Sequence, residues 1–217
     1  MRFGVLGTGV VGRTLGSKLV GLGHEVTMGS RTAGNASAVT WAASAGDGAH
    51  AGTMADAAAF GEIVVNATSG GGSLEALGAG AASLPGKVVV DVANALDGAS
   101  GFPPNLLVAN TDSLGEQIQR AFPEARVVKT LNTVNADVMV DPGLIPGGHA
   151  VFVSGNDASA KATVADLLRS FGWSEADIVD LGDITTARGP EMYLGLWVRL
   201  FGHMGTTHFN IRLVRGA

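Results

Sequence analysis

The sequence opens with an apolar stretch that leads directly into a glycine-rich turn. Residues 1–6 read as a strand, and Gly7, Gly9 and Gly12 follow with the spacing G-x-G-x-x-G before a helix begins. In that context the first glycine permits a tight turn, the second lets the backbone approach a pyrophosphate, and the third brings the helix close to the strand. The free N–H groups of the helix start face bound phosphates. We therefore predict a dinucleotide site here, the alternative being a glycine-rich turn without a ligand.

The end of the second expected strand, 24–28, indicates which dinucleotide. In an NAD-binding unit an Asp or Glu follows the first glycine by about 20 residues and holds the ribose 2′-hydroxyl. This chain has Gly29, Ser30, Arg31 and Thr32 at that place, with no carboxylate. A hydroxyl and a guanidinium can bind a 2′-phosphate, which a carboxylate would repel. We predict NADP(H) as the cofactor, and the alternative for Arg31 is a solvated loop charge.

Composition limits the class of protein. The chain has 217 residues, of which 46% are hydrophobic, and its net charge is −5. This length fits one large domain, or one domain with a small appendage. The acidic balance argues against nucleic acid or an anionic membrane surface as a partner. The chain has no cysteine, so disulfides and thiolate metal sites are excluded, and we expect no metal. With a strand beginning at Met1 and no long apolar segment, we expect a cytoplasmic protein.

Strand and helix signals alternate along the whole chain, which is typical of an α/β protein with a Rossmann-type, doubly wound, mostly parallel sheet. Further strands are expected at 49–52, 62–67, 87–92, 126–131, 150–153 and 178–181. Helices are expected at 38–45, 73–82 and 191–201 and from residues 56, 113 and 157, with a loop at 95–111. We expect residues 1–182 to form an NADP-binding Rossmann domain and residues 183–217 a small, partly helical C-terminal segment.

Small neutral side chains follow three of the expected strands. Thr68, Asn94 and the segment 132–135 stand where strands end, and ligands in open α/β sheets lie beyond the carboxyl ends of strands. These groups can hydrogen-bond a nicotinamide carboxamide and a second ring system, but they are poor proton donors. Ordinary turn and cap chemistry is the alternative.

No residue pair for acid–base chemistry is evident. Tyr193 is followed four residues later by Trp197, so the Tyr-x-x-x-Lys pair of short-chain reductases is missing. The histidines are expected to be structural, with His149 as the one left open. We expect Lys129, inside a strand, and Lys161, on a helix, to be solvated. We therefore assign no catalytic residue and favour hydride transfer between two bound rings, which needs only face-to-face placement.

Five short segments also match a known family, namely 7–12, 29–31, 66–68, 91–94 and 129–133. Through them the chain resembles the NADPH-dependent reductases of the deazaflavin coenzyme F420 over nearly its whole length. The flavin-binding reductase modules of the metalloreductases are similar. The resemblance implies a homodimer that moves hydride between NADP(H) and the deazaflavin, so coenzyme F420 or a flavin is the expected second substrate.

The predicted site has three parts. The pyrophosphate is assigned to Gly7, Thr8, Gly9, Val10, Val11 and Gly12. The 2′-phosphate is assigned to Ser30 and Arg31. The nicotinamide and the acceptor are assigned to Ala67, Thr68, Ala93, Asn94 and Asn132, with Thr133 nearby. Two other functions stay open: an NADPH-dependent flavin, quinone or carbonyl reductase, and a non-catalytic NADP(H)-binding sensor or scaffold protein.

The C-terminal segment carries an apolar, aromatic face that must be buried, because large exposed patches are uncommon on monomers. Packing on the chain's own sheet is one account. The other is that the segment covers the second ring and forms a two-fold interface. We expect a homodimer, with Trp197 and Met192 near the interface or the acceptor pocket.

Overall fold

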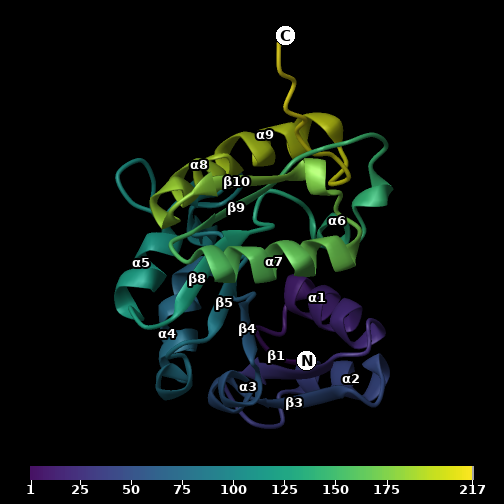
Figure 1. Ribbon diagram of the computed structural model, residues 1–217, viewed down its shortest axis with the longest axis vertical. Helices are drawn as coiled ribbons and strands as arrows, with labels where there is room; N and C mark the ends of the chain where they lie inside the picture. The colour runs from purple at the N-terminus through teal and green to yellow at the C-terminus, as the bar shows by residue number, and fades with distance from the viewer. Residues whose placement is uncertain (217) are drawn as a thin grey trace.

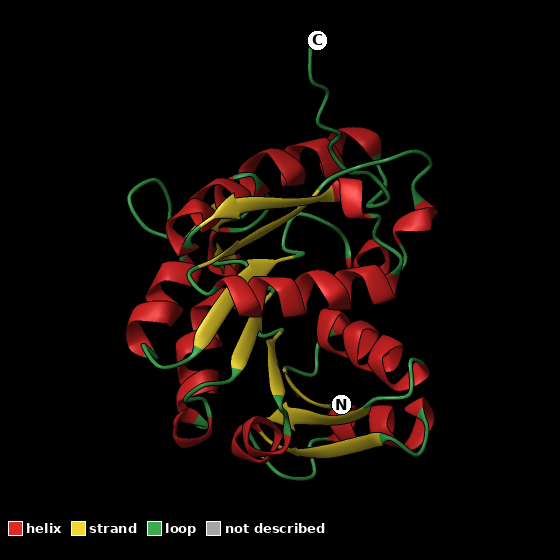
Figure 2. Ribbon diagram, viewed as in Figure 1, coloured by secondary structure: helices red, strands yellow, loops and turns green. Residues whose placement is uncertain are grey.

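A computed structural model describes residues 1–216. One eight-stranded sheet crosses the molecule in the order β10-β9-β8-β5-β4-β1-β2-β3 (Figures 1 and 2). Its strands are β1 (Arg2–Leu6), β2 (Glu25–Ser30), β3 (Ala49–Thr53), β4 (Ile63–Asn66), β5 (Val88–Asp91), β8 (Arg126–Thr130), β9 (Val151–Gly155) and β10 (Ile178–Gly182). All neighbouring strands are parallel except β8 and β9. The predicted Rossmann-type, mostly parallel α/β fold is confirmed.

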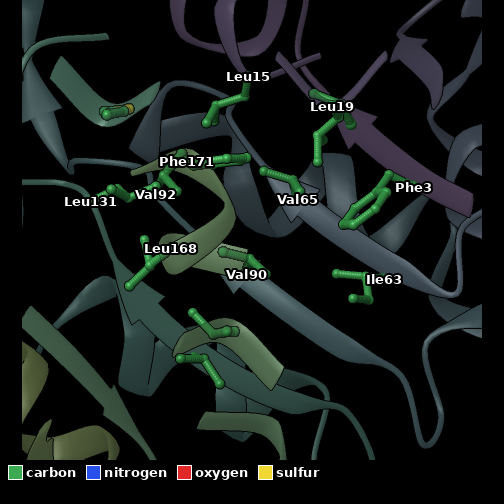
Figure 3. Packing of buried hydrophobic residues seen from close by; sticks show 14 of the residues in the cluster. Phe3, Leu15, Leu19, Ile63, Val65, Val90, Val92, Leu131, Leu168 and Phe171 are labelled. Atoms are coloured by element: carbon green, nitrogen blue, oxygen red, sulfur yellow. The ribbon is translucent and has the colours of Figure 1, made fainter. Parts of the chain in front are cut away.

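Helices cover both faces of this sheet. They are α1 (Val10–Gly21), α2 (Ala36–Ala45), α3 (Met54–Phe60), α4 (Ser73–Gly78), α5 (Leu114–Ala121), α6 (Ala136–Val140), α7 (Ala158–Phe171), α8 (Arg188–Met192) and α9 (Leu194–Met204). One core lies between the sheet and α1, α2, α6 and α7 (Figure 3). The other lies between the opposite face and α3, α4 and α5. Because both faces are covered, the central strands are continuous valine-rich runs.

The register of the central strands brings polar residues into one row. Leu6 of β1 pairs with Asn66 of β4, Asn66 with Asp91 of β5, and Asp91 with Lys129 of β8. These positions are the last or next-to-last of their strands. The carboxyl ends of β4, β5 and β8 therefore bring an amide, a carboxylate and an ammonium group to the same edge of the sheet.

Several local predictions need correction. The expected loop 95–111 contains a short antiparallel pair, β6 (Leu96–Asp97) and β7 (Asn105–Leu106). Helix α6 was not predicted, and α4 ends at Gly78 rather than at residue 82. Gly78 and Gly80 lie at that end, and glycine is unfavourable inside a helix. The expected helix 191–201 is divided at Tyr193 into α8 and α9.

The C-terminal helices lie across one end of the sheet, beyond β9 and β10 in Figure 1. Leu194 and Val198 of α9 are buried. The ring of Trp197 stacks between those of Phe201 and Phe209, with centroid distances of 5.9 and 5.2 Å. Within residues 1–216, no helix is both long and apolar enough to cross a membrane.

Candidate functional site

The three glycines of the turn are required for different reasons. Gly7 has a φ of +116°, and a Cβ atom there would lie 2.5 Å from the carbonyl oxygen of Ala67. A Cβ on Gly12 would lie 2.1 Å from the carbonyl oxygen of Gly7. Around Gly9, by contrast, nothing lies within 4 Å of that position. The fold therefore needs glycine at the first and third positions, while the second faces open space that a ligand can enter.

Helix α1 begins directly after this turn and has a free N-terminus. Gly9 is its N-cap, no side chain caps it, and its first turn contains no acidic residue. The first N–H groups of a helix have no partner inside the helix, and its dipole favours an anion. The turn thus fits the pyrophosphate of a dinucleotide.

A cleft of about 560 Å³ extends from the turn to the end of β2. Its lining residues are Gly7, Thr8, Gly9, Ser30, Arg31, Thr53, Met54, Ala55, Ala67, Thr68, Ser69, Gly72, Glu75, Ala76 and Ala79. Arg31 is exposed and makes no hydrogen bond or ion pair with another described residue. Ser30 is buried, and its hydroxyl donates to the carbonyl oxygen of Thr32 at 2.7 Å. The cleft is therefore lined by one positively charged side chain, that of Arg31, which has no partner in the described chain and lies where the Rossmann fold places the ribose.

A smaller pocket of about 260 Å³ adjoins this cleft, and Ala67 and Thr68 line both. It is lined by Val11, Ala67, Thr68, Val92, Ala93, Asn94, Leu96, Asn132, Val134, Asn135, Ala136, Met139, Leu194 and Trp197, none of which is ionisable. The side chains of Asn94 and Asn132 are joined, because Asn132 Nδ2 donates to Asn94 Oδ1 at 3.0 Å. Asn94 Nδ2 donates to the carbonyl oxygen of Asn132 at 2.9 Å. A broader groove of about 950 Å³ between α1 and α2 involves neither the glycine turn nor Arg31.

Most of the predicted site residues line one of these two hollows, and four do not. Gly12 lies beneath the turn, and Val10 is exposed on the outer side of α1. Thr133 is buried next to the lining residue Asn132. Met192 is partly exposed and accepts a backbone hydrogen bond from Asn110, outside both linings. Of the two residues expected near the acceptor, Trp197 alone lines the smaller pocket.

The chain between β8 and the smaller pocket has an unusual backbone. Leu131 is buried and has a φ of +60°, in the left-handed region. That conformation costs a residue with a Cβ on the order of 1–3 kcal/mol and persists where the surroundings enforce it. Leu131 directly precedes Asn132, whose Nδ2 also donates to the carbonyl oxygen of Pro190 in α8 at 3.0 Å. The surroundings of Asn132 thus hold the backbone in a conformation that it would not adopt alone.

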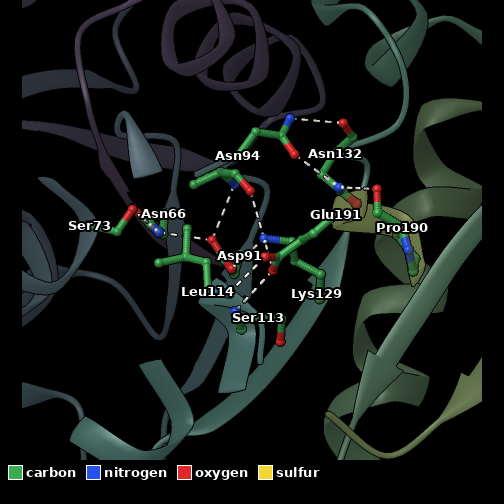
Figure 4. A network of polar contacts seen from close by, with 12 residues as sticks. Asn66, Ser73, Asp91, Asn94, Ser113, Leu114, Lys129, Asn132, Pro190 and Glu191 are labelled. Carbon is green, nitrogen blue, oxygen red and sulfur yellow. Dashed lines mark hydrogen bonds and ion pairs between the residues drawn. The ribbon is translucent and has the colours of Figure 1, made fainter. Parts of the chain in front are cut away.

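A buried ion cluster lies behind these amides (Figure 4). Lys129 is only 1% exposed, and its Nζ lies 2.8 Å from Asp91 Oδ2 and 2.8 Å from Glu191 Oε1. The third Nζ hydrogen goes to the carbonyl oxygen of Ala93 at 2.6 Å. The prediction that Lys129 is solvated is therefore wrong. Strand β8 lies inside the sheet with a core on each face, so the side chain has no route to water.

Every charge in the cluster is compensated. Burial would lower the pKa of Lys129, but the attraction of Asp91 and Glu191 outweighs it, and the pKa is raised. Asp91 Oδ1 accepts from Asn66 Nδ2 at 2.8 Å. The carboxylate of Glu191 accepts from the backbone N–H groups of Leu114 and Gly115 at 2.7 and 3.0 Å. These two groups begin α5, so a helix N-terminus offsets the excess negative charge.

The remaining candidates lie outside both hollows. His149 is buried, with Nε2 3.0 Å from the carbonyl oxygen of Pro142 and Nδ1 2.8 Å from Asn210 Nδ2. Lys161 pairs with Asp180 at 2.8 Å. No group of three His, Asp or Glu side chains among residues 1–216 is arranged to hold a metal ion.

Known proteins share this architecture. Residues 2–95 match the family described as NADP oxidoreductase, coenzyme F420-dependent. The crystal structure of a candidate F420-dependent NADP-reductase from Arthrobacter sp. FB24 is 55% identical, with a TM-score of 0.91, over 97% of this chain and 98% of that one.

More distant proteins are similar over part of their length. The metalloreductase STEAP3 of Rattus norvegicus is 27% identical over 190 residues, which are 88% of this chain and 36% of that protein. The chain thus spans about a third of the length of that curated relative. A reductive aminase from Aspergillus terreus, solved with NADPH, shares the fold at 22% identity and a TM-score of 0.63, over 93% of this chain and 61% of that one. The near full-length match at 55% identity and the matching family together show that this chain belongs to the coenzyme F420-dependent NADP oxidoreductases and is an NADP-dependent oxidoreductase.

Proposed function

We propose that this protein transfers hydride between NADP(H) and the deazaflavin coenzyme F420. The observation that carries the proposal is the junction of two unlike hollows at Ala67 and Thr68. The larger one offers a free helix N-terminus and an uncommitted arginine, which suit a charged nucleotide. The smaller one is neutral and partly apolar, which suits flat ring systems. A hydride donor and acceptor that meet at this junction need only close, face-to-face placement.

Each part of the chain has a proposed role. The glycine turn binds the pyrophosphate through backbone N–H groups, and Arg31 binds the 2′-phosphate through its guanidinium. Ser30, whose hydroxyl donates to the loop backbone, contacts the same phosphate after rotation. Asn94 and Asn132 hydrogen-bond the nicotinamide carboxamide, so the bound NADPH, which supplies the hydride, presents one face to the smaller pocket.

The choice of acceptor rests on the comparisons with known proteins. The family and the relative from Arthrobacter favour coenzyme F420. The similarity to a metalloreductase favours a second candidate, in which the same pocket takes a flavin. Both acceptors are planar, and none of the residues that line the smaller pocket separates them by charge.

Turnover measurements distinguish these candidates. Purified protein is mixed with NADPH and, in separate reactions, with coenzyme F420, FMN, a quinone or a small carbonyl compound, and the nicotinamide absorbance is followed. We expect rapid oxidation with coenzyme F420 and a much lower kcat/KM with the others. A higher kcat/KM with FMN would favour the flavin reductase. Tight NADPH binding without oxidation by any acceptor would favour a sensor or scaffold.

We further propose that residues 1–182 bind NADP(H), and that residues 183–217 complete the acceptor pocket and form a two-fold dimer. Leu196 and Met204 on α9 are 55% and 50% exposed, so this helix has an uncovered apolar face. Light scattering at micromolar concentration should give the mass of a dimer. A monomer would contradict the dimer. A Trp197→Ala variant with unchanged dimerisation and turnover would reduce the segment to core filling.

A further inference from the structure

The ion cluster holds the backbone that carries Asn94. The carbonyl oxygen of Ala93 accepts from Lys129 Nζ at 2.6 Å, and the N–H of Ala93 donates to Asp91 Oδ1 at 3.2 Å. Residue 93 is therefore held on both sides by two members of the same cluster. Asn94 follows immediately, and its amide lines the smaller pocket.

Two further polar side chains of the pocket, those of Asn132 and Thr68, are linked to the same cluster. Asn132 Nδ2 is shared between Asn94 and the carbonyl oxygen of Pro190, which directly precedes Glu191. On the opposite side, Thr68 Oγ1 donates to Asn66 Oδ1 at 2.7 Å, and Asn66 Nδ2 donates to Asp91. Three polar lining side chains are thus connected to the cluster through one intermediate residue each.

We propose that Lys129, with Asp91 and Glu191, is a positioning residue that sets Thr68, Asn94 and Asn132 for hydride transfer. None of the three charged residues lines either hollow, so the cluster acts through the amides and the hydroxyl. This inference rests on the proposed placement of the nicotinamide and the acceptor in the smaller pocket.

Stability alone does not explain the cluster. Buried ion groups can often be replaced by apolar side chains of similar volume without loss of stability. Here the ammonium group of Lys129 contacts Ala93, which directly precedes the pocket residue Asn94. Asp91 binds Asn66, the partner of Thr68, and Glu191 directly follows Pro190, the partner of Asn132. Reaction rates depend steeply on such placement, since a displacement of about 1 Å can cost on the order of 100-fold.

The test compares two buried carboxylates that anchor the same helical segment. Glu191→Gln keeps the shape of the side chain but removes its ion pair with Lys129. Glu116→Gln is the matched control, because Glu116 is also buried and accepts from Arg188 Nε of α8 at 2.8 Å. Among residues 1–216 its side chain makes no hydrogen bond with Thr68, Asn94 or Asn132. We expect Glu191→Gln to lower kcat with coenzyme F420 by roughly tenfold or more, with the Kd of NADPH within about twofold of wild type. The control should keep kcat and both KM values.

A second readout does not depend on turnover. The side-chain amide NMR signals of Asn94 and Asn132 should shift in Glu191→Gln and stay in place in Glu116→Gln. If Glu191→Gln does not fold, Asp91→Asn, which removes the other ion pair of Lys129, takes its place in both measurements. An unchanged kcat in a folded Glu191→Gln enzyme, or equal losses in both variants, would overturn the inference and leave the proposed function standing. If the wild-type protein does not oxidise NADPH with any of the acceptors tested, both the inference and the proposed function are overturned.

Discussion

The two ends of the site are built in opposite ways. The proposed nucleotide end consists mainly of backbone: a glycine turn and a free helix N-terminus, with the exposed Arg31 directly after β2. The proposed acceptor end depends on side chains from segments far apart in the sequence, and behind it Asp91, Lys129 and Glu191 are buried together. At the first end, the first N–H groups of α1 and the Arg31 side chain have no partner within the described chain and are free to bind a ligand. At the second end, the charged groups are paired with one another inside the protein.

This difference determines what a substitution can do at each end. At the nucleotide end, open space at Gly9 and solvent around Arg31 let side chains change without disturbing the core. At the acceptor end, removal of one charge leaves others buried without a partner, which is costly. Substitutions at Gly9 or Arg31 should therefore affect binding, and the loss of a charge from the buried cluster should lower stability.

The largest effect is expected at Lys129. Lys129→Met leaves Asp91 and Glu191 facing each other without a cation, and breaking a buried ion group in this way costs about 3–5 kcal/mol. Urea denaturation should show this loss as a lower midpoint with a similar m-value. A loss below about 1 kcal/mol, which is typical of surface pairs, would remove the contrast between the two ends.

The next effect concerns the cofactor. Arg31→Ala removes the only uncommitted cation among the lining residues of the larger cleft, so NADPH binding should weaken by roughly 1.5–3 kcal/mol. Binding of NADH, which lacks the 2′-phosphate, should barely change, and so should the melting temperature. Fluorescence titration with both nucleotides measures the difference. Equal weakening of both would show that Arg31 does not contact the phosphate.

A smaller effect is expected at the turn, where two glycines form a matched pair. Gly9→Ala places a methyl group in open space, so the fold should survive while NADPH binding weakens by about tenfold, or ~1.4 kcal/mol. Gly12→Ala places the same methyl group 2.1 Å from a carbonyl oxygen, so folding itself should suffer. Circular dichroism and NADPH titration separate the two outcomes. Unchanged affinity in folded Gly9→Ala would mean that the motif is only a turn.

The smallest effect is expected at a surface ion pair, which serves as a reference for the buried cluster. Arg120 donates hydrogen bonds to Asp112 and is the main cause of the lowering of the Asp112 pKa from 3.8 to about 2. Because the folded pKa is depressed, this carboxylate stabilises the protein above pH 3.8, and that contribution is lost as the pH falls towards 2. Solvent screening limits it to about 0.2–1 kcal/mol. In Asp112→Asn, the free energy of unfolding should therefore fall less between pH 3.8 and about 2, by about 0.2–1 kcal/mol relative to wild type, as measured by urea denaturation at each pH.

The sequence predicts those parts of the structure that depend on neighbouring residues. The first strand, the glycine turn and α1 follow from a local motif, and the valine-rich strands follow from unbroken apolar runs. The short elements β6, β7 and α6 were missed because two to five residues carry little periodic signal. The residues of the proposed nucleotide end could be placed along one cleft for the same local reason.

Only part of the proposed acceptor end could be predicted from the sequence. Asn94 and Asn132 could be placed because they follow strands, but Lys129 was assigned to solvent. Its burial depends on where β8 lies in the sheet, which the sequence of one strand does not reveal. A signal was nevertheless present, since Asp91 and Lys129 are opposite charges near the ends of two apolar strands that pair in register. The contribution of Glu191 depends on tertiary packing and has no local signal.

The arrangement of the cluster also affects how the chain can mature. Of the three charged residues in the cluster, Glu191 is synthesised last, after every strand of the eight-stranded sheet. Until it arrives, Lys129 has one carboxylate instead of two, and the first N–H groups of α5 lack their acceptor. A fragment that ends at residue 182 would keep the whole sheet but retain that defect permanently. The two sides of the boundary proposed there are therefore joined through the buried ion cluster, which is complete only when α8 has docked.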